Sequence, residues 1–316
     1  MPFLGPLYAL AGFALFATHD AIIKYLGGTY SPFQIIFFAT LFSFPLVSFM
    51  LMRDATQGNL RPVHPWWTTL RTICAVIAQF SAFYAFSVLP LAQTYVLLFA
   101  TPLLITLIAI PILGEKVGIH RLGAVVVGLV GVLVVLQPRS GAEFSIGHLA
   151  GISSAVFNSL ASVIVRKIGR DERPVVLMLY PMAANFIVMG ALLALVYVPM
   201  PVTHLGGLAV ISALGFTAGL FMIAGYKNGD AAIVAPMQYS QIIWASLFGY
   251  IFFAESVDRP TLIGAGIIIL SGLYIVFRET RRGPDSQTPV LRTRSRGATA
   301  ASFRISLFLR RAKARG

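Results

Sequence analysis

Ten long apolar stretches divide this sequence, and they constrain its fold more than any other feature. A helix that crosses a membrane needs about 20 mostly apolar residues, and each stretch reaches or approaches that length. The runs are too long for strands and lack their two-residue alternation. The chain is therefore predicted to be an all-α, polytopic membrane protein with ten transmembrane helices. The stretches cover residues 3–23, 33–52, 68–89, 91–113, 120–136, 147–165, 174–197, 206–226, 231–253 and 261–278.

The composition excludes a single soluble core. Hydrophobic residues make up 57% of the chain and charged residues only 11%, which is too little charge to cover a solvated surface. Cys74 is the one cysteine, so an intramolecular disulfide cannot form. No cleavable signal peptide is expected, because no basic segment precedes the apolar run that starts at Phe3.

The net charge of +13 is concentrated near the end of the sequence. Residues 278–316 hold eleven Lys and Arg against two acids and so carry +9 of that total. A basic segment directly after a membrane helix is attracted to anionic lipid headgroups, so we predict lipid and not nucleic acid as its partner. Residues 279–316 are predicted to be a disordered cytoplasmic tail. A short amphipathic piece at Phe303–Leu309, lying on the membrane, is the alternative for part of it.

Lys and Arg in the loops predict the orientation. If the N-terminus is cytoplasmic, the inner loops hold nine of these residues and the outer loops three. Cytoplasmic loops carry the excess of positive charge in membrane proteins. Both termini are therefore predicted to face the cytoplasm, which agrees with an even number of spans.

The two halves of the chain repeat a series of residues in the same order, which indicates a duplication. Each half has five spans, an odd number, so the second half is predicted to be inverted in the membrane. Two inverted halves can exchange conformations, and this architecture favours a secondary transporter that works by alternating access. Gly5, Lys24, Gly27 and Pro32 match Gly147, Arg166, Gly169 and Pro174 at a shift of 142, and Ala92, Glu115, Gly123 and Gly131 match Ala232, Glu255, Gly264 and Gly272 at shifts of 140 to 141.

The most specific pattern is LPLAQTYVLLFATPLLITLIAIPILGEKVGIHRLGAVVVGLVGVLVVLQP, residues 89–138, with a proline inside a span, then Gly-Glu, then a helix rich in glycine. A second copy begins at DAAIVAPMQYSQ and has Ala254-Glu255 in place of Gly-Glu. Over nearly all of residues 3–278 the chain resembles the EamA family of the drug/metabolite transporter superfamily. The resemblance implies EamA-type repeats at 3–138 and 147–278 and secondary transport of metabolites across the bacterial inner membrane. It also implies a cavity built mainly by the first, third, fourth, sixth, eighth and ninth spans.

The opening FALFATHDAIIKYL resembles a branch of this family that includes riboflavin and S-adenosylmethionine uptake proteins. We therefore expect a small-molecule substrate, with uptake of a vitamin such as riboflavin as the favoured reading. Export of amino acids, other metabolites or drugs is the alternative.

Polar residues inside a membrane are costly, so each is a candidate for function. His19 and Asp20 lie late in the first span, about 25 Å along a helix that starts at Phe3. They are predicted to form a gate or to contact a proton or the substrate. The alternative is an interfacial pair between Asp20 and Lys24, one turn further on.

Three further charged residues lie near the ends of spans. Arg71 either extends to the lipid headgroups beside Trp66 and Trp67 or contacts an anionic substrate. Glu115 and Glu255 end the fourth and ninth spans and are predicted to be a structural pair of the repeat. Each would cap the start of the next helix or bind a neighbouring cation.

Pro102 and Pro236 fall inside the fourth and ninth spans at different depths, so they are not matched by the repeat. A proline removes a backbone hydrogen bond, and the kinks are predicted to expose carbonyls that line a cavity. Neutral polar groups are further candidates for substrate binding, with packing as the alternative for each aromatic ring. Tyr239 and Trp244 with the nearby glutamines suit a flat ring. The neutral candidates are Gln79, Tyr84, Gln93, Tyr95, Asn158, Gln238, Tyr239, Gln241 and Trp244.

Several motifs are missing from the sequence. It contains no Walker A motif, HExxH, GxSxG or Cys/His cluster, so we expect no enzyme, cofactor or metal. A channel would need rings of like charge or carbonyls, and a non-transporting membrane partner would leave the duplication without a purpose. Glycines in the fifth and tenth spans permit close helix contact, either within the chain or in a homodimer.

Overall fold

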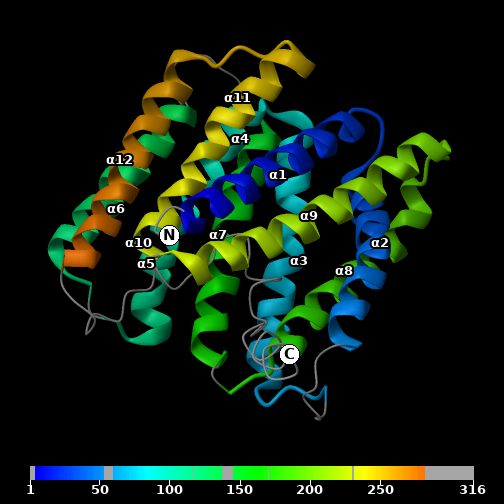
Figure 1. Cartoon of the computed structure of the whole chain (residues 1–316), viewed down its shortest axis with the longest axis horizontal. Helices are drawn as coiled ribbons and strands as arrows, with labels where there is room; N and C mark the ends of the chain where they lie inside the picture. The colour runs from blue at the N-terminus through cyan, green and yellow to red at the C-terminus, as the bar shows by residue number, and fades with distance from the viewer. Residues whose placement is uncertain are drawn as a thin grey trace.

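The structure is a computed structural model that describes residues 4–52, 60–115, 117–136, 145–169, 171–229 and 231–281. Within these ranges it is helical and contains no strand. Eight helical segments are long and apolar enough to cross a membrane, and a shorter apolar helix covers Pro32–Ser48. The chain is therefore an all-α, polytopic membrane protein, as predicted. The predicted tail lies outside the described residues from residue 282 onward. The elements are α1 (Leu4–Gly27), α2 (Pro32–Met52), α3 (Pro65–Val88), α4 (Leu91–Leu98), α5 (Thr101–Leu113), α6 (Ile119–Leu136), α7 (Ile146–Ile168), α8 (Pro174–Val196), α9 (Val202–Asn228), α10 (Ala231–Val234), the 3-10 helix η1 (Ala235–Tyr239), α11 (Ser240–Phe253) and α12 (Arg259–Arg281) (Figure 1).

The fourth and ninth predicted spans are interrupted. The structure divides 91–113 into α4 and α5, with Pro102 in the first turn of α5. It divides 231–253 into α10, η1 and α11, with Pro236 in the first turn of η1. A proline has no backbone N–H and is favoured at the first turn of a helix. Helical hydrogen bonding is therefore interrupted near both prolines, although Phe99, Ala100 and Tyr239 keep right-handed helical dihedral angles. α5 and α11 begin 139 residues apart, at Thr101 and Ser240.

The two interrupted segments also end alike. Gly114, at φ 69°, terminates α5, and Ala254, at φ 53°, terminates α11. The left-handed conformation suits glycine, whereas in alanine it costs roughly 1–2 kcal/mol. The two residues lie 140 positions apart, and each is followed directly by a glutamate, Glu115 or Glu255.

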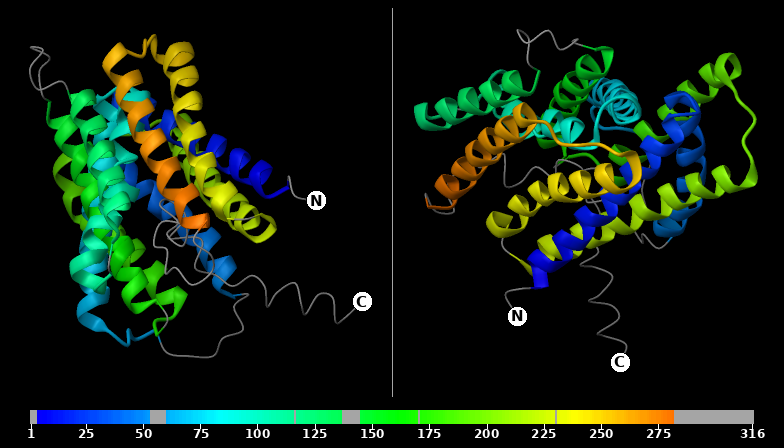
Figure 2. Two further views of the ribbon diagram at one scale, coloured as in Figure 1. Left: turned by 90° about the vertical axis from the view of Figure 1, so that its left-hand side faces the viewer. Right: turned by 90° about the horizontal axis from the view of Figure 1, so that it is seen from above.

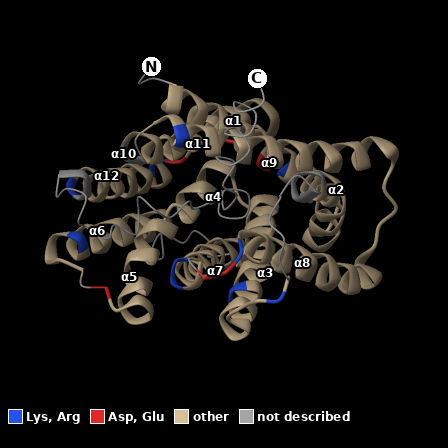
Figure 3. Ribbon diagram, turned by 60° about the horizontal axis from the view of Figure 1, so that its bottom comes forward, with Lys and Arg blue, Asp and Glu red and all other residues tan. Residues whose placement is uncertain are grey.

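Helices from the first half of the chain (α1–α6) pack on helices from the second half (α7–α12). α1 lies along α9, α3 along α7, α2 against α8 and α6 along α12. The pair formed by α6 and α12 lies at one side of the molecule (Figures 1 and 2). Charged residues lie mainly at helix ends and in connections (Figure 3). The central part of the molecule is thus enclosed by helices from both halves.

Glycines set the distance between α6 and α12, and one of them gives a testable prediction. A Cβ atom on Gly264 would lie 2.6 Å from the carbonyl oxygen of Gly131 and 2.3 Å from Val135 Cγ2. Because a backbone atom is involved, Gly264→Ala should force the helices apart and destabilise the protein by about 1–3 kcal/mol. The measurement is the unfolding temperature of the purified protein in detergent.

Gly266→Ala is the matched control, because nothing lies within 4 Å of a Cβ placed there. Alanine is also a better helix former than glycine by about 1 kcal/mol. The control should therefore keep or raise the unfolding temperature. Equal effects of the two substitutions would show that the α6–α12 contact is not tightly packed.

Candidate substrate cavity

A cavity with a volume of about 390 Å³ lies among the helices. This is within the usual range for sites that hold small molecules. Its lining comes from α1, α3, α4, α5, α7, α9, η1 and α11, which belong to the spans that the resemblance implied, and also from α2 and α8. The paired helices α6 and α12 do not contribute to the lining among the described residues.

The cavity gathers nine of the residues that the sequence singled out for binding or for a helix kink, while the other five of that group lie elsewhere. The described lining does not include Tyr84, Gln93, Pro236, Tyr239 and Trp244. The nine that line it are His19, Asp20, Arg71, Gln79, Tyr95, Pro102, Asn158, Gln238 and Gln241.

Asp20 is buried at 2% exposure in the cavity wall. It accepts a hydrogen bond from the Tyr95 hydroxyl, and its Oδ1 lies 2.8 Å from Nδ1 of His19. Such burial does not fit the alternative of an interfacial residue. Lys24, the proposed partner in that alternative, forms an ion pair with Glu255. Asp20 is thus a buried carboxylate held by groups from α1 and α4.

Arg71 is also only 2% exposed, and it lies in the wall of the cavity. This position does not fit a side chain that extends to lipid headgroups. Its Nη1 donates to the carbonyl of Leu177 in α8. Pro181 lies four residues after Leu177 and has no N–H for that carbonyl. The proline therefore frees an acceptor that holds the arginine against the cavity wall.

Gln79 of α3 and Asn185 of α8 form a second contact between these two helices, about two turns along α3 from Arg71. Asn185 Nδ2 donates to Gln79 Oε1 over 2.9 Å. Asn185 is 3% exposed, and its Oδ1 has no hydrogen-bond donor in the structure. The Arg71–Leu177 and Gln79–Asn185 pairs have the same sequence offset of 106, so α3 and α8 run side by side in the same direction.

The polar candidates outside the cavity have local partners. Gln93 Nε2 lies 3.0 Å from Nε2 of His148 on α7. The ring of Tyr239 packs edge-on against Phe99 at 5.2 Å. Trp244 packs against Phe248 at 6.3 Å between ring centroids, and its Nε1 is buried without an acceptor.

An ion pair lies beyond one end of the cavity, where α1, α3 and α11 meet. Lys24 Nζ lies 2.7 Å from Glu255 Oε1 and donates to the Leu89 carbonyl over 2.5 Å. Glu255 Oε2 accepts the backbone N–H of Leu91 over 3.0 Å. The pair therefore holds both sides of the short α3–α4 joint.

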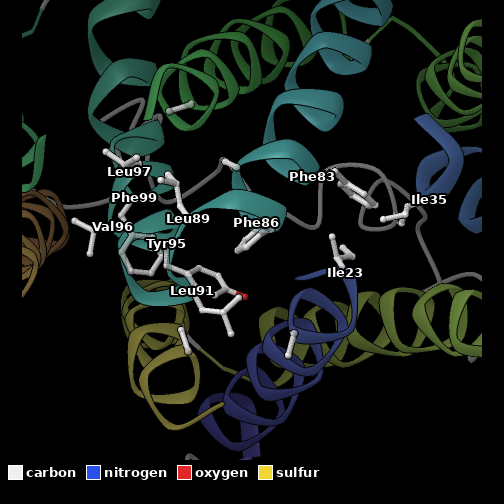
Figure 4. Packing of buried hydrophobic residues seen from close by; sticks show 14 of the residues in the cluster. Ile23, Ile35, Phe83, Phe86, Leu89, Leu91, Tyr95, Val96, Leu97 and Phe99 are labelled. Atoms are coloured by element: carbon white, nitrogen blue, oxygen red, sulfur yellow. The ribbon is translucent and has the colours of Figure 1, made fainter. Parts of the chain in front are cut away.

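Tight apolar packing lies beside this ion pair. A Cβ on Gly27 would lie 2.4 Å from the Ser87 Cβ, so α1 and α3 touch there. Phe86 and Tyr95 pack with their ring centroids 5.3 Å apart, and Ile23 of α1 belongs to the same buried cluster (Figure 4). The cavity is closed at this end by side chains that are almost fully buried.

The opposite end has a matching ion pair but a different packing. Arg166 at the end of α7 binds Glu115 after α5, and Lys167 Nζ donates to the Ile112 carbonyl over 3.1 Å. However, α7 and α9 make no contact within the described residues that compares with the one between α1 and α3. Ion pairs are thus present at both ends, while only one end has the close helix contact.

Sequence reasoning missed Asn185 and Pro181, although both left a signal. An amide inside an apolar span is costly, which should have marked Asn185 as a candidate. A proline in the middle of a span frees the carbonyl four residues earlier and predicts a donor nearby. No group of three or more His, Cys, Asp or Glu that could hold a metal lies in the described ranges. Cys74 is buried and free there.

Comparison with known proteins identifies the family. The family model described as the EamA-like transporter family matches residues 3–137 and again residues 145–278. The chain belongs to the EamA-like transporter family. It is therefore a multi-pass membrane protein of a transporter family, and the resemblance inferred from its sequence is confirmed.

Several named transporters are similar to this chain along most of their length. The chain is 25% identical to the pseudopaline exporter CntI of Pseudomonas aeruginosa strain UCBPP-PA14 over 280 residues, which covers 88% of this chain and 97% of that protein. It is 25% identical over 266 residues to the S-adenosylmethionine uptake transporter of Rickettsia felis, covering 84% and 90%. A solved crystal structure with 20% sequence identity has the same fold, with a TM-score of 0.60 over 90% of this chain and all of that one.

Proposed function

We propose that this EamA-like protein is a secondary transporter that moves a small metabolite through the central cavity by alternating access. The two halves, residues 3–138 and 147–278, would be inverted repeats. The observation that carries this proposal is the cavity itself. Its mainly apolar wall carries a few charged and amide side chains, it lies among membrane-crossing helices from both halves, and close helix packing covers one end only.

The difference between the two ends gives the proposed motion. α1 packs against α3 at the closed end, while α7 and α9, the corresponding helices of the second half, stay apart in the described residues. In the opposite state, α7 would approach α9 and α1 would leave α3. With the orientation expected from the loop charges, the cavity would be open toward the cytoplasm in this conformation.

The relatives change the favoured hypothesis about the substrate, which was riboflavin. The matched relatives are named as a pseudopaline exporter and as S-adenosylmethionine uptake transporters, so they include both directions of transport. Riboflavin gains no support from them. A neutral flavin would also leave Arg71 without an anionic partner. We therefore propose S-adenosylmethionine and related amino-acid derivatives as the first compounds to test, with either direction open.

The cellular setting remains part of the proposal. We infer a multi-pass protein of the bacterial inner membrane with both termini in the cytoplasm. The basic tail would bind anionic headgroups. These inferences are supported by the charge distribution of the sequence.

The test is uptake into proteoliposomes that contain the purified full-length chain. Labelled S-adenosylmethionine should enter with saturable kinetics, and excess unlabelled compound inside should accelerate its entry. Flux that does not saturate would indicate a channel. The absence of flux for every amino-acid derivative tested, in both directions, would contradict the transporter proposal.

A further inference from the structure

Charge is separated along the cavity. Among the described lining residues, Asp20 is the carboxylate and Arg71 is the permanent cation. Both are buried at 2% exposure. Charges of opposite sign in one cavity favour a ligand that carries both signs, provided that they lie far enough apart to be bound separately.

The spacing follows from α3. Arg71 and Gln79 are eight residues apart on this helix, which corresponds to about 12 Å. Phe83 lies one turn beyond Gln79, and its ring contacts His19, the neighbour of Asp20, at 6.2 Å. The acidic end of the cavity is therefore at or beyond the level of Gln79, and the basic end is at Arg71.

Unused hydrogen-bonding atoms mark the same two ends. At the basic end, Arg71 donates through Nη1 to Leu177, and its Nε is buried without an acceptor. A guanidinium offers five N–H donors in a fork that matches a carboxylate. At the other end, Asn185 Oδ1 is buried without a donor beside Gln79. The basic end therefore lacks a hydrogen-bond acceptor for Arg71 Nε, and the other end lacks a donor for Asn185 Oδ1.

We propose that the cavity binds an elongated zwitterion, with a carboxylate on Arg71 and a cationic N–H donor near Asn185 and Asp20, about 12 Å away. This inference deepens the proposed transport function by naming its substrate class. A buried charge without a counter-ion is costly, and the ligand carboxylate supplies that counter-ion for Arg71. The carbonyl freed by Pro181 positions the guanidinium before the ligand arrives.

Extended glycine peptides can measure this distance, because they carry one ammonium and one carboxylate on a polar chain. An extended peptide spans at most about 3.3–3.6 Å per residue, so tetraglycine matches the proposed separation and glycine does not. We expect tetraglycine, but not glycine, to raise the unfolding temperature of the purified full-length protein in lipid nanodiscs. Tetraglycine amide, which lacks the carboxylate, should bind about tenfold to a hundredfold more weakly.

Variants assign the carboxylate to its residue. Arg71→Gln should abolish the difference between tetraglycine and its amide, and Arg71→Lys should retain part of it because the charge remains without the fork. Arg259→Gln is the matched control, because Arg259 is exposed at the start of α12 and outside the described lining. It should leave the preference unchanged.

If an Arg71 variant does not fold, the proposal is still tested by comparing the binding of tetraglycine and tetraglycine amide to the unaltered chain. Equal binding of tetraglycine and tetraglycine amide, or tighter binding of glycine than of tetraglycine, would overturn the zwitterion site. Binding does not depend on flux. Saturable transport without this preference would therefore refute the zwitterion site alone, and this preference without transport would refute the transporter proposal alone.

Discussion

Glu255→Gln is expected to destabilise the protein by about 2–4 kcal/mol and to reduce transport severely, because it leaves a buried lysine without its counter-ion. The Lys24 and Glu255 side chains are only 11% and 18% exposed. The same glutamate accepts the Leu91 N–H, and Lys24 binds the Leu89 carbonyl. The substitution therefore weakens the connection between α1, α11 and the α3–α4 joint together. Chemical unfolding in detergent and counterflow in proteoliposomes measure the two effects.

Two further variants test the assignment to the ion pair. Asp258→Asn removes an exposed acid three residues later and should change neither stability nor transport appreciably. The double exchange Lys24→Glu with Glu255→Lys should recover part of what either single change loses. If Glu255→Gln were as stable and active as the unaltered chain, the ion pair would have no structural importance.

The two ion pairs act as braces between the halves and not as gates. Lys24–Glu255 and Arg166–Glu115 are both formed in one conformation, although the helix packing differs between the two ends. A gate would be formed only at the closed end. Each pair instead connects the end of one helix, α1 or α7, to the end of an interrupted segment of the other half.

The sequence was sufficient to predict eight of the spans, because each depends on local hydrophobicity alone. The apolar part of α2 is shorter, at Pro32–Ser48, and the stretch 231–253 is divided among α10, η1 and α11. Helices α1, α3, α7, α9 and α12 extend a few residues past the apolar stretches at one or both ends. The interruptions at Phe99–Ala100 and through η1 were anticipated only as proline kinks. Local sequence patterns cannot fully specify these interruptions, because the interruptions depend on the packing of neighbouring helices.

The cavity was less predictable, because it depends on how each helix is rotated. The sequence left Arg71 with two alternatives, and only the contact with Leu177 places it in the cavity wall. It offered Lys24 a partner one turn away, whereas the structure gives it Glu255 from the other half of the chain. Tyr239 and Trp244 looked suitable for a flat ligand, but they pack against Phe99 and Phe248.

Cysteines at Gly27 and Ser87 are expected to stop transport when they are oxidised to a disulfide. These positions form the contact between α1 and α3 at the closed end, and the proposed motion requires that contact to open. A Cβ on Gly27 would lie 2.4 Å from Ser87 Cβ, so the helices must separate by about 1–2 Å to accommodate a disulfide. Counterflow before and after oxidation, in a background that carries Cys74→Ala, measures the effect.

A cysteine pair at Ser81 and Ser153 provides the matched control. Their hydroxyl oxygens lie 3.3 Å apart across the contact between α3 and α7, two helices that are packed along each other in the described conformation and are expected to move together. Oxidation should leave this variant active, while a reductant should restore transport to the variant with cysteines at Gly27 and Ser87. Full activity of that oxidised variant would mean that α1 and α3 do not separate, and the substrate would have to leave by a route that avoids this end.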